Sequence, residues 1–188
     1  MLRKYVLSTM FMLCCIAIVT FVITTNAVSV DNIYSNEKLG IKFVVPEGVN
    51  LYTAESPGPM ASRITSETTL WLVNSSIAAE RINVKVSQFQ DATESELNKS
   101  KQELDYNPSP IPNYQKISVK FIKIGKQGDK NALEHIHALK QKEPKKLRQI
   151  MIIHKGRAIL FTCSTSPERF DSADKQFFDL IFHTMEFK

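Results

Sequence analysis

The histidines of His135-x-His137 are the residues whose type and spacing come closest to a chemical site. A spacing of two on a β-strand places both imidazoles on one face, close enough to share a metal ion. A third ligand would come from a neighbouring strand, and His154 is the candidate. However, Leu133 and Leu139 share that face, which is typical of histidines at the margin of a half-buried sheet. We expect this structural role and no cofactor, with a metal ion as the alternative.

No other residues form a recognisable catalytic set. Nucleophilic and acid–base catalysis need a serine, cysteine or carboxylate beside a suitable partner, and the sequence offers no such grouping. Two of the three cysteines lie in an N-terminal apolar run, and Cys163 has no cationic neighbour. Cys163 is therefore expected to be a small buried hydrophobic residue. We predict that the protein is not an enzyme.

Positive charge is concentrated in one part of the chain. Between Lys116 and Arg157 there are twelve Lys or Arg residues against three acidic ones, whereas the whole chain carries a net charge of +5. Basic residues bracket one expected turn: Lys140, Lys142, Lys145, Lys146 and Arg148. Such residues can simply keep strand ends solvated and discourage edge pairing. The functional interpretation is a patch that binds an acidic protein partner or anionic lipid headgroups.

The elements that would position these residues centre on a predicted β-hairpin over 147–165. Its two strands, around 149–154 and 158–163, carry apolar residues at consecutive positions, so both faces must be covered. Gly156 lies between them and can supply the positive φ that a short hairpin turn needs. We expect this hairpin near the centre of a sheet.

A helix over 167–184 is predicted to cover one face of the hairpin. Pro167 suits a first helical turn, and Phe170, Ala173 and Phe177 recur at helical spacing. We expect the truncation of Phe177 to be among the costliest single changes in this chain.

The rest of the chain is predicted to add further strands and one more helix. Apolar patterns predict strands at 41–45, 69–73, 81–89, 115–124 and 132–141. Thr93-Glu94-Ser95-Glu96 is a capping box that starts a helix reaching 105. Short connections favour antiparallel neighbours. The sequence therefore predicts an α+β domain with a single antiparallel sheet of about six to eight strands and helices packed on both faces.

An apolar segment precedes this domain. Arg3 and Lys4 stand before an uncharged run over 5–23, a pattern that places the body of the protein on the far side of a membrane. A small-x-small sequence follows the run and could be cleaved, but the run is also long enough to span a bilayer. We predict a signal peptide or membrane anchor at 1–27, one domain at 28–188, and an exported, periplasmic or extracytoplasmic location.

The order of these elements also carries a resemblance. A strand ending in Pro46-x-Gly48 leads to a meander of strands and a capped middle helix, then to a last helix closing on Met185-Glu186-Phe187. This order resembles the PsbP-like superfamily, including the bacterial DcrB-like envelope proteins, over 33–187. One departure is Val49, where many relatives carry a tryptophan. The resemblance implies an antiparallel sheet with helices on both faces, a leader peptide and a non-enzymatic accessory role at a membrane.

Together these features predict an exported, non-catalytic accessory or binding protein that acts at or near a membrane-associated assembly. The alternative is a metal-binding protein or metalloenzyme built around His135 and His137. The expected partner is a protein or an anionic membrane surface. Nucleic acid is not expected, because the chain is predicted to be exported and its basic strands lack interleaved aromatic residues.

Overall fold

The computed structural model describes residues 32–63, 65, 68–74, 83–89, 91–106 and 111–188. The predicted leader at 1–27 lies outside these residues and stays a prediction. Within the described ranges, none of the helices combines the length and the apolar character needed to cross a bilayer.

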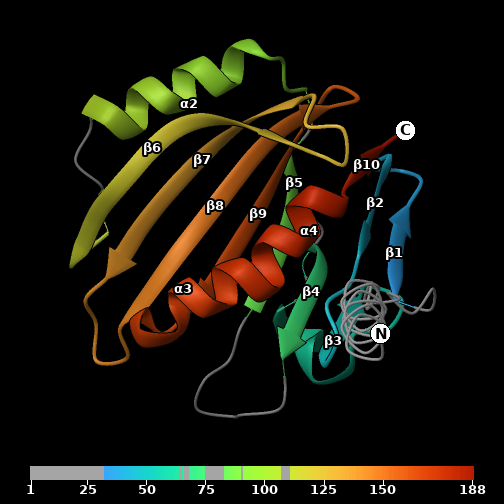
Figure 1. Cartoon of the computed structure of the whole chain (residues 1–188), viewed down its shortest axis with the longest axis horizontal. Coiled ribbons are helices and arrows are strands. Elements are labelled where there is room, and N and C mark those ends of the chain that lie inside the picture. The colour runs from blue at the N-terminus through green and yellow to red at the C-terminus, as the bar shows by residue number, and fades with distance from the viewer. Residues whose placement is uncertain (1–31, 64, 66–67, 75–82, 90, 107–110) are drawn as a thin grey trace, which may run out of the picture. The chain divides into compact units, whose positions relative to one another are not determined.

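Seven antiparallel strands form the main sheet, in the order β3-β4-β5-β9-β8-β7-β6 (Figure 1). Their bounds are β3 Val49–Thr53, β4 Thr68–Asn74, β5 Asn83–Phe89, β6 Tyr114–Ile124, β7 Lys130–Leu139, β8 Lys145–His154 and β9 Arg157–Thr165. The predicted hairpin is β8 and β9, and it lies inside the sheet as expected. Lys155 and Gly156 form its turn with φ of 48° and 69°, and positive φ at both positions matches the twist of a two-residue hairpin.

Helices pack on both faces of this sheet, which confirms the predicted α+β class. Helix α2 (Ser95–Tyr106) lies over β6, β7 and β8. The opposite face carries one continuous C-terminal helix, whose successive parts are η2 (Pro167–Arg169), α3 (Phe170–Ala173), η3 (Asp174–Phe178) and α4 (Asp179–Thr184). Figure 1 shows these two helical layers on either side of the strands. A short 3-10 helix, η1 (Gly58–Arg63), connects β3 and β4.

The first strands of the described chain form a second, smaller sheet, which the prediction of a single sheet did not include. It contains β1 (Ile33–Asn36), β2 (Ile41–Val44) and β10 (Glu186–Phe187), with β2 in the middle. Beyond β10, the N–H of Lys188 donates to the carbonyl of Gly40 at 2.9 Å. Gly40 has φ of 64°, and a Cβ there would lie 2.7 Å from the carbonyl oxygen of Lys188. The close approach of the two chain segments therefore requires a glycine.

The C-terminal helix contains one wide turn that changes its expected register. The segment η3 is a π-helix, in which the hydrogen bonds span five residues instead of four. This extra residue places Phe178 in the core, fully buried, and leaves Phe177 only partly buried. The truncation of Phe177 was expected to be among the costliest changes because regular α-helical spacing was assumed; the wide turn instead makes Phe178 the fully buried aromatic at this point of the helix.

The hydrophobic core is divided unequally between the two faces. The larger part lies between the main sheet, the C-terminal helix and the small sheet, and includes Phe43, Phe161 and Phe182. Cys163 is buried in it as expected, and burial raises the pKa of its thiol. The smaller part lies under α2, where Leu97 packs against residues of β7, β8 and β9. The face under α2 therefore has room for polar side chains.

Candidate functional site

His135 and His137 lie on the face of β7 that carries α2. Their rings stack with centroids 4.4 Å apart and planes 22° apart, and both side chains are buried. Tyr114 from β6 contacts both rings, with centroid distances of 5.9 Å to His135 and 5.2 Å to His137. The structure thus places the two histidines on one face, as the spacing predicted, within a buried cluster of three rings.

Hydrogen bonds at both ring nitrogens of His135 indicate which tautomer its neutral ring adopts. Its Nδ1 lies 3.2 Å from Oε1 of Gln149, and its Nε2 lies 2.7 Å from the hydroxyl of Tyr114. With the amide oriented this way, Oε1 can only accept, so Nδ1 carries the proton; in the neutral ring, Nε2 then accepts from the hydroxyl of Tyr114. Gln149 in turn donates to Thr162 at 3.4 Å. The network therefore joins β6, β7, β8 and β9 through a neutral imidazole.

Burial makes both imidazoles weak bases. Desolvation, with a smaller contribution from neighbouring His135, lowers the pKa of His137 from 6.5 to about 4. Desolvation also lowers the pKa of His135, although the hydrogen bond with Gln149 opposes this shift. Among the described residues, Nδ1 of His137 has no hydrogen-bond partner. Both rings are therefore neutral at pH 7, which costs less in a buried site than a charged ring would.

His154, the predicted third metal ligand, is not brought to this pair. His135 pairs with Gln149, and His154 lies five positions further along β8, on the opposite face and beside the hairpin turn. Its Nε2 lies 3.1 Å from the carbonyl oxygen of Lys188, and its ring contacts Phe187 with centroids 5.3 Å apart. The three histidines therefore do not form one site.

The pair itself offers few free ligand atoms. Both ring nitrogens of His135 are hydrogen-bonded, so a metal there would have to displace Tyr114 or Gln149. In the part of the chain that the structure describes, no three or more His, Cys, Asp or Glu side chains are arranged to hold a metal ion. Metal binding by His135 and His137 stays a prediction, and metal analysis of the purified protein is the direct check.

A charged cluster lies on the opposite face of the sheet, around Arg148. Its Nε donates to Glu134 of β7 at 2.9 Å, and its NH1 lies 2.7 Å from carboxylate oxygens of both Asp174 and Asp179. Arg148 is buried, and its guanidinium lies 5.3 Å from the ring centroid of Phe182. Its donors are thus directed inward, so Arg148 is not available to the exposed basic patch to which we had assigned it.

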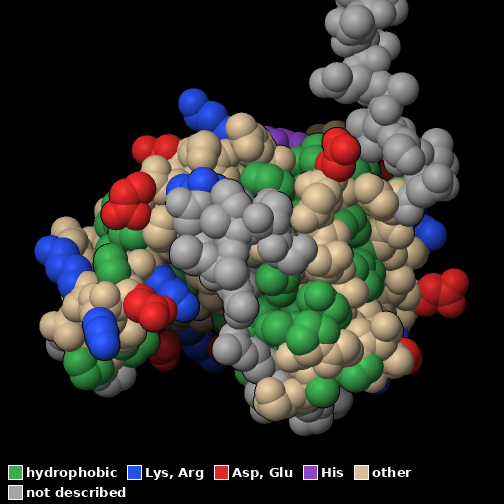
Figure 2. Space-filling view, turned by 90° about the horizontal axis from the view of Figure 1, so that it is seen from below, with side chains coloured by type: hydrophobic (Ala, Val, Ile, Leu, Met, Phe, Trp, Pro, Cys, Tyr) green, Lys and Arg blue, Asp and Glu red, His purple; other side chains and the backbone are tan. Residues whose placement is uncertain are grey.

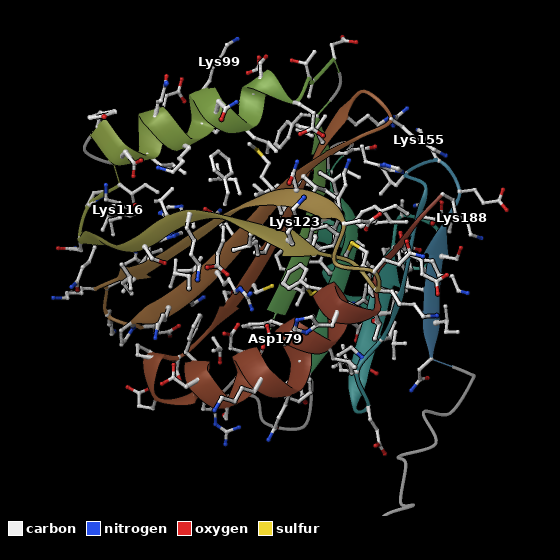
Figure 3. All side chains as sticks on the ribbon, turned by 45° about the horizontal axis from the view of Figure 1, so that its top comes forward. Lys99, Lys116, Lys123, Lys155, Asp179 and Lys188 are labelled. Carbon is white, nitrogen blue, oxygen red and sulfur yellow. The ribbon has the colours of Figure 1, made fainter. Side chains whose placement is uncertain are left out.

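The π-turn explains how one guanidinium reaches two carboxylates of the same helix. Asp174 is the first residue of η3, and the N–H of Asp179 bonds to its carbonyl. A five-residue turn places these two side chains one above the other, facing β8, where Figure 3 shows Asp179 on the sheet side of the helix. A regular α-turn would align residues four apart and rotate one carboxylate away. The wide turn therefore clamps the C-terminal helix to β8.

Electrostatics within this cluster are closely balanced. Burial by itself would lower the pKa of Arg148, but Asp179, Asp174 and Glu134 more than offset this and raise it. Burial raises the pKa of Asp174, and Arg148 offsets only part of that shift. Lys120 of β6 approaches the other oxygen of Glu134 at 3.1 Å, without the alignment of a hydrogen bond. Three carboxylates thus face two cations in this cluster.

The predicted basic patch is reduced to the turn between β7 and β8. Lys140, Lys142 and Lys145 are exposed there. Lys146 is partly buried, with its Nζ 3.3 Å from Asp171 and 4.2 Å from the ring centroid of Phe170. On the face shown in Figure 2, basic side chains lie among acidic ones and do not form one continuous positive surface. We define the basic turn as Lys140, Lys142 and Lys145.

Sequence reasoning missed the partners that give these residues their roles. Tyr114 and Gln149 complete the histidine network, and Glu134 and Asp174 complete the arginine cluster. One signal was present: Arg148 alternates with Ile150 and Ile152 along β8, so it lies on a core-facing row. A charged residue in such a row needs a buried partner of opposite charge.

Comparisons with known proteins identify the fold. No protein-family model matches the sequence, and no curated protein matches it. Among solved structures, the PsbP protein CyanoP from the cyanobacterium Synechocystis superposes with a TM-score of 0.57 at 17% identity, over 86% of this chain and 96% of that one. LpqN of Mycobacterium tuberculosis, described as involved in cell envelope biogenesis, has a TM-score of 0.54 at 13% identity, over 77% of this chain and 81% of that one.

A Bacteroides thetaiotaomicron protein of known structure also matches, with a TM-score of 0.54 and 9% identity. The match covers 84% of this chain and 48% of that protein, so this chain spans about half of its length. At these identities the likeness concerns the fold. The predicted resemblance to the PsbP-like superfamily is confirmed at that level.

Proposed function

We propose, proceeding from the PsbP-like fold of this chain, that the protein is an exported, non-catalytic accessory module that acts at a membrane-associated assembly. The proposal rests on this fold together with the apolar segment that precedes it in the sequence and is predicted to be a leader at 1–27. LpqN, which shares the fold, is described as involved in cell envelope biogenesis. Because a fold by itself does not determine a function, the proposal also draws on the exposed charge of this chain.

We assign the contact with an anionic membrane surface to the basic turn. Its three exposed lysines would contribute about 1 kcal/mol each near anionic headgroups. An attraction of this size is screened by salt and is too weak to hold a protein at a membrane alone. A second attachment, by a retained leader or by a protein partner, completes the proposal.

The compartment is tested first, with the full gene expressed in cells. We expect the protein to fractionate outside the cytoplasm, with 28–188 open to added protease once the outer layer is permeabilised. A cytoplasmic marker protein must stay protected in the same sample. Protection of 28–188 under these conditions would overturn the export proposal.

The membrane contact is tested by sedimentation with vesicles of phosphatidylcholine alone or mixed with phosphatidylglycerol. We expect binding to the anionic vesicles only, weakening as salt rises. The triple change Lys140→Glu, Lys142→Glu and Lys145→Glu should abolish it. The matched control is Lys38→Glu, Lys155→Glu and Lys175→Glu, which changes the net charge equally at other exposed positions. Equal binding to both vesicles, or equal loss in both variants, would contradict the assignment.

A further inference from the structure

The β6 strand is a long edge of the main sheet. Its eleven residues pair with β7 on one side, and no described strand pairs with its other side. A free edge presents unpaired backbone N–H and C=O groups to any extended chain nearby. The opposite edge, β3, has only five residues. An edge as long as β6 is therefore the part of this fold best suited to strand addition.

The first residues of β6 pair irregularly with β7, whereas the rest of the strand pairs in regular register. The pairing with β7 slips between Lys116 and Ser118, which makes a bulge at Ile117. Lys116 turns onto the end of α2, where its Nζ lies 3.0 Å from the carbonyl oxygens of Leu104 and Asp105 (Figure 3). From Ser118 onward each residue pairs in register with β7. The free edge is thus the segment 118–124, which matches a strand of ordinary length.

The side chains of this segment define what would pair with it. Phe121 is 48% exposed at the edge, so an apolar side chain of an added strand could cover it. Lys123 lies two residues further along on the same face as Phe121, whereas Lys120 lies on the opposite face, and β6 contains no acidic residue. Lys120 contacts Glu134 but remains 61% exposed, so it can also meet a second carboxylate.

We propose that residues 118–124 of β6 bind an acidic extended segment of a partner protein as an added strand. Backbone hydrogen bonds would supply the affinity, an apolar side chain would cover Phe121, and carboxylates would face Lys120 and Lys123. A second copy of this chain fits less well, because two β6 strands would bring lysines together with no carboxylate from either strand. The inference rests on the proposed binding role, and it is independent of the membrane contact at the basic turn.

The probe is a fluorescein-labelled peptide of about nine residues, long enough to pair with the free segment. It is built from Val and Thr, with Val placed opposite Phe121 and Glu placed opposite Lys120 and Lys123 in an antiparallel pairing. Its counterpart carries Lys in place of every Glu. With the full-length protein in mild detergent, we expect the acidic peptide to bind at least tenfold more tightly than the basic one. Binding should slow amide hydrogen exchange at alternate residues of 118–124, because the N–H groups that point away from β7 become hydrogen-bonded.

Two variants with matched controls locate the contact. Phe121→Ser should weaken peptide binding about fivefold, the size of a good cross-strand pair, whereas Phe89→Ser should have little effect although Phe89 is similarly exposed at 46%. Lys123→Glu should weaken peptide binding by at least as much as Phe121→Ser. Lys142→Glu makes the same charge change in the basic turn and should have little effect on peptide binding. Phe121→Ser should also leave vesicle binding unchanged, which separates this inference from the membrane contact.

Three results would overturn the inference. The first is peptide binding without slower exchange in 118–124. The second is a loss of binding in Lys142→Glu that equals the loss in Lys123→Glu, which would indicate general attraction to positive charge. The third is dimer formation by sedimentation, with 118–124 protected in the absence of peptide, which would make a second copy the occupant.

Discussion

Replacing Arg148 with methionine tests whether the buried cluster holds the C-terminal helix on the sheet. Methionine keeps a long flexible side chain against Phe182 but removes the charge and all the hydrogen bonds to Glu134, Asp174 and Asp179. The change therefore isolates the electrostatic role of the guanidinium from its packing.

The size of the effect follows from how far each carboxylate can regain water. The side chain of Glu134 is 3% exposed and cannot be rehydrated without opening the sheet, whereas those of Asp174 and Asp179 are 27% and 33% exposed and can turn outward. An unpaired buried charge typically costs about 3–5 kcal/mol. Lys120 still reaches Glu134, so we expect about 3 kcal/mol for Arg148→Met, a large part of the stability of an ordinary domain.

The assay is urea unfolding at pH 7, followed by circular dichroism. If Glu134 is the main source of the cost, adding Glu134→Gln to Arg148→Met should restore about 2 kcal/mol, since the buried charge is then gone. The control is Arg157→Met, which removes one hydrogen bond at 2.8 Å to Gln88 and should cost about 1 kcal/mol. A loss of about 1 kcal/mol or less for Arg148→Met would refute the reasoning. Simple additivity of the Arg148 and Glu134 changes would refute it too.

Two further predictions concern the histidine pair and the π-turn. Since the pKa of His137 is about 4 in the fold and 6.5 as the ordinary value, the unfolded chain takes up its proton first. The contribution of His137 to the free energy of unfolding is therefore complete above pH 6.5 and falls towards pH 4, with a loss of about 2 kcal/mol at pH 5. His137→Phe should remove this loss. The raised pKa of Asp174 acts in the opposite direction, but it affects the native protein and the variant equally. Identical stability–pH profiles for the native protein and the variant would contradict the lowered pKa of His137. Phe178→Ala should cost about 3–5 kcal/mol in urea unfolding and Phe177→Ala clearly less, and the reverse order would show that the helix keeps regular α-helical register.

The parts of the fold that could be predicted are those with strong local signals. The β8–β9 hairpin combines two apolar runs with a glycine turn, and α2 is preceded by the sequence pattern of a capping box, so both were found close to their observed bounds. The strand β3 was missed because the preceding Pro46 and Gly48 read as the end of the strands in that region. The two-residue β10 is too short to show any periodicity.

For the candidate sites, the sequence predicted only which residues of one strand share a face, because side chains alternate between the two faces of a strand. This alternation correctly placed His135 and His137 on one face. The sequence did not show the register between β7 and β8, because that pairing belongs to the tertiary structure. Once Gln149 is known to lie opposite His135, the alternation of side chains places His154 on the other face of the sheet. Likewise, Arg148 meets Asp174 and Asp179 from 26 and 31 positions away, and the π-turn that aligns them leaves no sequence pattern that we could recognise.

The small sheet has a consequence for the order in which the chain can fold as it is made. Its middle strand, β2, is among the first described elements to be synthesised, yet one of its neighbours is β10, which pairs Glu186 with Lys42. Until β10 has been synthesised, one edge of β2 lacks its strand partner. The core residues Ile41 and Phe43 also lack the C-terminal helix against which they pack. Contacts this distant in sequence form slowly. The packing around β2 can therefore be completed only after the segment that carries the C-terminal helix and β10 has been synthesised.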